Sequence, residues 1–178
     1  MNKMNEKTKK LCITAMGIAL FVVTSLCLQV PIFENYYICL GYVIMMVFLY
    51  SVDTISGTLV GFLGVILYCI CISGLRGMPG WSLGNIAIGV LLGLCFKQTK
   101  KLEKKYKILA FSLEIAAIII ATTIGIMGVK SIVEYFLYAQ PIIVRMASNV
   151  YAYVADILTM IMALPLCKLL DKKLKKYL

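Results

Sequence analysis

Asp156 is the residue whose position in this chain most strongly indicates chemistry, because it lies near the middle of a long apolar run. A carboxylate near the centre of a bilayer costs roughly 2.5–3.5 kcal/mol on insertion scales, so it must face protein or water. Asn149 and Tyr153 precede it at spacings that place all three on one helix face, and Arg145 lies one turn earlier. We expect this column to line a ligand pocket open to the outside. The alternative is a structural pair between Asp156 and a tyrosine hydroxyl or an arginine.

A stretch rich in glycine and proline, residues 73–81, is the second candidate for the pocket. It contains Arg76 and ends at Trp81, the only tryptophan of the chain. This density of glycine and proline predicts an irregular turn, which is tolerated at membrane depth where it lines a cavity. Ser82 is expected to cap the helix that follows. Small residues recur at every fourth position of that helix and predict close helix packing: Asn85, Gly89 and Gly93. We expect Arg76, Trp81 and Asn85 to contribute to the pocket.

A short polar turn at residues 31–37 supplies three further candidates, Glu34, Asn35 and Tyr36. We expect them at the outer mouth of the same pocket. Aromatic side chains at such a mouth suit a flat heteroaromatic ligand, which they can bind by stacking. For any single tyrosine, anchoring at the membrane–water interface is the alternative role.

The residues that enzymes and metal sites require are missing from the sequence. It contains no histidine, no nucleotide-binding P-loop and no hydrolase motif, and its seven cysteines form no CxxC pair. We therefore expect no catalytic centre, no cofactor and no metal site. Transport driven by ATP would require partner subunits.

The composition is that of a membrane protein, with 62% hydrophobic and 15% charged residues. This excludes a disordered chain and disfavours an ordinary soluble domain. The apolar runs predict an all-α integral membrane protein, a six-transmembrane-helix bundle that forms one domain over residues 1–178. The predicted spans cover about residues 11–30, 38–50, 55–72, 82–96, 108–129 and 146–170.

The positive charges alternate between the connections of this bundle. Most lysines lie in the amino-terminal tail, in a basic loop at residues 97–107 and in the carboxy-terminal tail. The other connections hold only Arg76, Lys130 and Arg145. This asymmetry predicts that both termini are cytoplasmic. The net charge of +10 therefore reports membrane topology rather than nucleic-acid binding.

Ala15 and Ala19 lie four residues apart in the first predicted span. Small residues at this spacing let another helix approach closely. That helix could belong to this bundle or to a partner protein, and the spacing alone leaves both open.

Several segments together resemble a known family, the substrate-binding S components of energy-coupling factor (ECF) vitamin transporters, in the riboflavin and hydroxymethylpyrimidine-type branch. The resemblance extends over almost the whole chain. It is carried by AMGIA at 15–19, YYICLG at 36–41, SGTLVGFLG at 56–64, GNIAIGVLLGLCF at 84–96 and ALPLCKLLDKKLKK at 163–176. The chain departs from the family at residues 51–53, Ser-Val-Asp, where members often have Gly-Pro. The histidine motif of the nickel and cobalt S components is absent, which argues against a metal substrate.

The resemblance implies a high-affinity binding subunit in the bacterial cell membrane, which takes up a vitamin or a related small heterocycle from outside. It implies a transmembrane coupling subunit and two ATPase subunits as partners, with Ala15 and Ala19 as the docking face. Two other classes stay open: a stand-alone secondary transporter or channel that uses Asp156 as a proton site, and a membrane scaffold subunit without a ligand.

Overall fold

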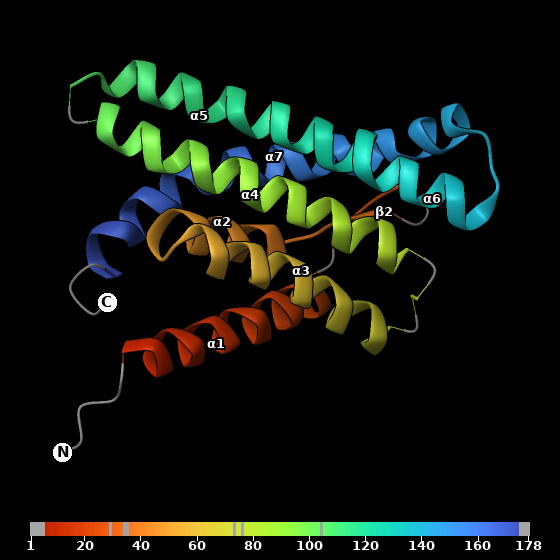
Figure 1. Cartoon of the computed structure of the whole chain (residues 1–178), viewed down its shortest axis with the longest axis horizontal. Coiled ribbons are helices and arrows are strands. Elements are labelled where there is room, and N and C mark those ends of the chain that lie inside the picture. Colours follow the sequence, from red (N-terminus) through yellow and green to blue (C-terminus); the bar gives the residue numbers. More distant parts are fainter. Residues whose placement is uncertain are drawn as a thin grey trace.

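The computed structural model describes residues 6–28, 30–33, 36–72, 74–75, 77–103 and 105–174, with side chains for all of these except residues 30–33, 36–37 and 174. Over these ranges the chain is a bundle of long helices with one two-stranded hairpin (Figure 1). The elements are α1 (Glu6–Cys27), β1 (Val30–Phe33), β2 (Tyr36–Ile38), α2 (Gly41–Ser51), α3 (Thr54–Cys71), α4 (Met78–Glu103), α5 (Lys107–Thr122), the π-helix η1 (Thr123–Lys130), α6 (Ser131–Tyr138) and α7 (Ile142–Leu174).

Five of the described helical segments are long and apolar enough to cross a membrane: α1, α3, α4, the continuous segment Lys107–Tyr138, and Ile142–Lys173 within α7. The prediction of a helical membrane protein is thereby confirmed. The remaining predicted span, the second one at about residues 38–50, corresponds to α2, which has only 11 residues. At 1.5 Å per residue, α2 covers about half of a hydrocarbon core roughly 30 Å thick.

The short helix α2 forms the centre of the bundle. Tyr42, Met45 and Met46 on α2 have no exposed surface, and α2 contacts α1, α3, α4 and α7. The chain reaches α2 through the antiparallel pair β1–β2, in which Val30 pairs with Ile38, and β2 packs against α7. The turn predicted at residues 31–37 is therefore a hairpin, and the first helix ends at Cys27 rather than at residue 30.

Glycines let α3 and α4 pack closely, as the spacing of small residues predicts. A methyl group added to Gly89 would lie 2.6 Å from Thr58 Oγ1 and 2.9 Å from its Cα atom. Gly93 meets Thr54 one turn further along in the same way. Such close contacts strengthen the van der Waals attraction between the helices. This attraction matters because the hydrophobic effect does not drive helices together inside a lipid bilayer.

The helix α4 is longer than predicted at both ends. It begins at Met78, so that Pro79 and Trp81 lie in its first turn and Ser82 is not its cap. The Ser82 hydroxyl instead donates to the Pro79 carbonyl at 3.2 Å. Proline is tolerated in a first turn because its missing N–H would have no helical partner there. At the other end α4 continues to Glu103, so the predicted loop at residues 97–107 is mostly helix.

The predicted fifth span is also extended. Helix continues from Lys107 to Tyr138, through a π-helical segment that contains Gly125 and Gly128, so the predicted connection at residues 130–145 is largely helical. A methyl group on Gly84 would lie 2.8 Å from the Gly125 carbonyl oxygen, so this glycine pair brings α4 against η1. A π-helical turn redirects the residues that follow it, and such turns are frequent at functional sites.

The described elements have two distinct ends (Figure 1). The start of α1, the junction of α4 with α5 and the end of α7 lie at the left of the view, while α6 and the α6–α7 connection lie at the right. The lysines of α4, α5 and α7 gather at the first end. The second end holds the buried polar residues described next.

A first prediction tests the α3–α4 packing. We expect Gly89→Leu to lower the stability by about 1–3 kcal/mol or more, because the added atoms must displace the Thr58 backbone. Thermal unfolding of the purified protein in detergent, followed by Trp81 fluorescence, measures the effect. Val90→Leu is the matched control, since Val90 is 41% exposed on the same helix. Equal stability of Gly89→Leu and the control would contradict the packing.

Candidate functional site

Tyr42 is the centre of a buried hydrogen-bond network that joins α2, α3 and α4. The Trp81 indole N–H donates to the Tyr42 hydroxyl oxygen, and that hydroxyl donates to Asn85 Oδ1, each at 2.8 Å. The Asn85 amide nitrogen donates to the Gly61 carbonyl at 3.0 Å. Trp81 also packs edge-to-face on Tyr68, with ring centroids 5.7 Å apart. Asn85 is fully buried, and its amide has both an acceptor and a donor partner.

Asp156 on α7 extends this network. Its side chain is 5% exposed, interacts with the Tyr42 hydroxyl and lies close enough to Lys130 for a charge interaction. The tyrosine partner weighed as a structural alternative for Asp156 is thus present. The positive charge of Lys130 comes from the last residue of η1.

A second polar cluster lies between α6 and α7. The Asn149 side-chain amide donates to Ser131 Oγ and to Glu134 Oε2, each at 3.1 Å. Lys130 Nζ lies 4.0 Å from Glu134 Oε1, and their side chains are 14% and 6% exposed. Buried charges need such partners, because an isolated charge in a low-dielectric interior is far more costly. The cluster therefore holds one carboxylate and one ammonium group in fixed places.

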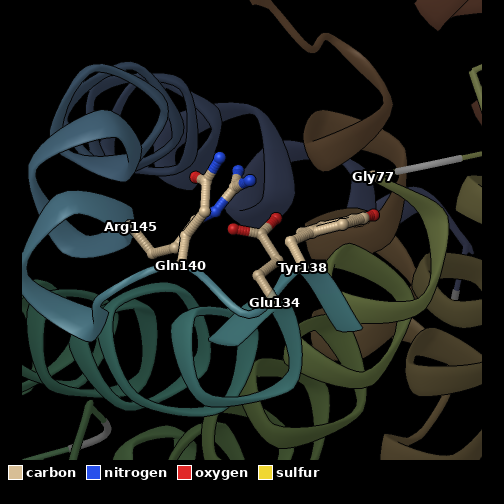
Figure 2. A pocket seen from close by; sticks show the side chains of 5 residues that line it. All are labelled: Gly77, Glu134, Tyr138, Gln140 and Arg145. Carbon is tan, nitrogen blue, oxygen red and sulfur yellow. The ribbon is translucent and has the colours of Figure 1, made fainter. Parts of the chain in front are cut away.

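A cavity of about 440 Å³ opens beside this cluster, lined by Gly77, Glu134, Tyr138, Gln140 and Arg145. Figure 2 shows the polar ends of Glu134, Gln140 and Arg145 gathered together, with the Tyr138 ring beside them. The Arg145 guanidinium lies over the Tyr138 ring, 4.6 Å from its centroid. Arg145 Nε is buried and has no hydrogen-bond partner among the described residues.

These side chains can recognise a small polar heterocycle. Glu134 accepts hydrogen bonds, Arg145 donates them and Gln140 does both. Tyr138 supplies an aromatic face. The volume falls in the range of about 300–1,000 Å³ that is typical of small-molecule sites. The cavity thus combines directional polar groups with a flat aromatic surface.

The structure brings most of the described candidates to this end of the bundle. Trp81 and Asn85 belong to the Tyr42 network, and Arg145, Asn149 and Asp156 follow one another along α7. Tyr153 pairs instead with Thr123 at the start of η1, with a distance of 3.0 Å between the two hydroxyl oxygens. Glu34, Asn35 and Arg76 lie outside the described residues. Tyr36 is in β2, and its side chain lies outside them as well.

Sequence reasoning missed several residues of the site. They are Tyr42, Lys130, Ser131, Glu134, Tyr138 and Gln140. Lys130, Glu134 and Tyr138 are spaced by four residues, which is the signal of a helix face and could have found them. Tyr42 carries no such signal, because a tyrosine near the start of an apolar run is equally typical of an interfacial anchor.

A comparison with protein families matches residues 5–172 to the ECF-type riboflavin transporter, S component. The chain belongs to this family. The match confirms the resemblance seen in the sequence, and it identifies the chain as a subunit of a membrane transport system rather than a member of an enzyme family. Together with the apolar helices, it makes the chain a multi-pass membrane protein. Searches of curated proteins and of solved structures gave no significant match.

A second prediction tests the Tyr42 network. We expect Tyr42→Phe to lower the stability by about 1–3 kcal/mol, because buried Asn85 and Trp81 each lose a hydrogen-bond partner. Thermal unfolding measures the loss, and a change in Trp81 emission reports its altered surroundings. Tyr135→Phe is the control, since Tyr135 is 44% exposed. A stability loss no larger than in the control would show that the network does not hold these helices together.

Proposed function

We propose that this S component is the substrate-binding subunit of an ECF-type importer, and that it binds its vitamin in the cavity between α6 and α7. The observation that carries this proposal is the buried Arg145 Nε, which has no hydrogen-bond partner in the part of the chain that the structure describes and lies beside Glu134 in the wall of a cavity of suitable size. The family model names riboflavin, a flat heteroaromatic vitamin. Riboflavin or a related heterocycle is therefore the proposed substrate.

The proposed contacts follow from the chemistry of each side chain. A heterocycle with an amide-like edge can donate to Glu134 and accept from Arg145. Its ring can stack on Tyr138. Asn149 and Asp156 lie further along α7. They either contact the ligand directly or hold neighbouring side chains in place, as Asn149 does by its hydrogen bond to Glu134. We retain Glu34, Asn35, Tyr36, Arg76, Trp81, Asn85 and Tyr153 as proposed contributors around the same mouth.

We further propose that the cavity faces the outside of the bacterial cell membrane and that both termini are cytoplasmic, in a bundle of six spans. The lysines at the opposite end support this orientation under the positive-inside rule. Because α2 is too short to cross the membrane by itself, the hairpin that leads into it would complete this crossing. The hydrogen bonds between β1 and β2 would satisfy backbone groups of the extended segment inside the membrane.

Energy for uptake would come from partners, namely a transmembrane coupling subunit with two ATPase subunits. Ala15 and Ala19 are proposed as the docking face. Both are exposed, whereas Gly17 and Phe21 on the same helix are buried against the bundle. A partner helix could therefore approach α1 closely along its exposed side.

A third prediction concerns the ligand. We expect Arg145→Ala to weaken riboflavin binding by roughly tenfold to 150-fold, the effect of losing one charge-assisted hydrogen bond. Titration of the purified protein with riboflavin, followed by quenching of the vitamin's fluorescence, gives the dissociation constant. Ser148→Ala is the control, because its exposed hydroxyl donates to the Val144 carbonyl of its own helix. Unchanged affinity in both Arg145→Ala and Asp156→Asn, with the proteins folded, would remove this cavity from consideration.

A fourth prediction separates docking from binding. We expect the double variant Ala15→Trp and Ala19→Trp to abolish vitamin uptake by cells while riboflavin binding to the isolated subunit is unchanged, because bulky side chains block close helix approach. Leu20→Trp is the matched control, on the exposed surface of α1 but turned away from the two alanines. Loss of binding together with uptake would show that the alanines pack inside the bundle.

A further inference from the structure

Ion pairs tie α4, α5 and α7 together at the end of the molecule opposite the cavity. The fully buried Glu114 carboxylate lies 2.9 Å from Lys168 Nζ and accepts from the Thr99 hydroxyl at 3.2 Å. Lys168 also lies 3.2 Å from Glu103, and Lys100 lies 2.8 Å from Asp171. These pairs fix three helix ends, and they compensate the charges of Lys100 and Lys168.

A groove with further lysines surrounds these pairs. It consists of two adjoining hollows that share Lys107 in their walls. One, of about 490 Å³, is lined by Tyr50, Lys100, Glu103, Lys107, Lys168, Asp171 and Lys172. The other, of about 710 Å³, is lined by Lys105, Tyr106, Lys107, Ile108, Leu109 and Ser112. We call the two together the lysine groove.

Three lysines of the lysine groove have no ion-pair partner among the described residues. Among the described residues, no carboxylate lies within ion-pair distance of Lys105, Lys107 or Lys172. Lys107 lies in both hollows, with Lys172 in one and Lys105 in the other, so the positive charge is continuous along the groove. Lysine binds phosphate groups as a compact point charge.

The other wall of the lysine groove is apolar and exposed. Ile108 is 88% exposed and Leu109 is 50% exposed, directly after Lys107 at the start of α5. Tyr106, 49% exposed, lies at the same level. Tyrosine and lysine are typical of the membrane–water interface, and α5 continues from there into a segment apolar enough to cross a bilayer. The groove thus offers a cationic wall at the headgroup level beside an apolar wall that continues toward the hydrocarbon.

From this complementarity we propose that the lysine groove binds an anionic phospholipid of the surrounding leaflet. Its phosphate contacts Lys105, Lys107 and Lys172, and an acyl chain lies along Ile108 and Leu109. Basic pockets between transmembrane helices bind anionic headgroups in this way. The proposal is independent of vitamin binding, because the groove and the cavity lie at opposite ends of the bundle.

Native mass spectrometry of the full chain in detergent tests the proposal, with phosphatidylglycerol, phosphatidylcholine and inorganic phosphate added in separate titrations. The groove variant is K105Q/K107Q/K172Q, and the matched control is K97Q/K101Q/K173Q. The control removes the same charge from exposed lysines at the same end that do not line the groove. We expect the groove variant to bind phosphatidylglycerol about tenfold or more weakly and the control to bind it like the parent protein. The single variant K107Q, expected to show a smaller loss, serves if the triple variant does not fold.

Four results would overturn the proposal. Equal losses in the groove variant and the control would show diffuse attraction to the basic end. Equal affinity for phosphatidylcholine and phosphatidylglycerol would show that the groove does not recognise the negative charge of the lipid headgroup. Displacement of phosphatidylglycerol by inorganic phosphate at similar concentration would identify a free phosphate site. If the groove variant keeps its lipid affinity but no longer co-purifies with the energising subunits, the groove is instead a surface for a protein partner.

Discussion

Polar groups inside a bundle that crosses a membrane must find partners within the protein, and three of them meet at the Tyr42 hydroxyl. It accepts from Trp81, donates to Asn85 and interacts with Asp156, so one oxygen joins α2, α4 and α7. With no water in the bilayer core, each of these groups would be costly without its partner. This contact links the three helices to one another inside the bundle.

Regular helix is interrupted where the cavity forms and is intact at the opposite end. The hairpin β1–β2 precedes α2, and η1 lies between α5 and α6, with Lys130 as its last residue and Glu134 one turn further along. Irregular backbone is tolerated in a membrane protein where it is buried or lines a cavity. At the other end, α4, α5 and α7 are joined by ion pairs such as Lys100–Asp171 and Lys168–Glu114. The proposed vitamin cavity therefore lies at the end with irregular backbone, and ion pairs join the helices at the other end.

Much of this arrangement could be predicted from the sequence, because the bilayer limits what an apolar run can do. The long helices follow from hydropathy, and the shared face of Asn149 and Asp156 follows from helical spacing. The errors have physical causes. Pro79 reads as a helix breaker but is tolerated in a first turn, and the lysines after Phe96 read as a loop although lysine favours helix. The hairpin and the partners of Tyr42 depend on contacts between distant segments, which local patterns do not encode.

The central claim is that this chain holds one vitamin molecule by itself, without the energising subunits. Native mass spectrometry of the subunit purified alone from cells grown in complete medium, followed by denaturation and identification of the released compound, tests it most directly. The account predicts one flat heterocyclic vitamin for each chain, with riboflavin or a close relative as its identity. A subunit that is folded, carries no small molecule and takes up none when riboflavin is supplied would contradict the account.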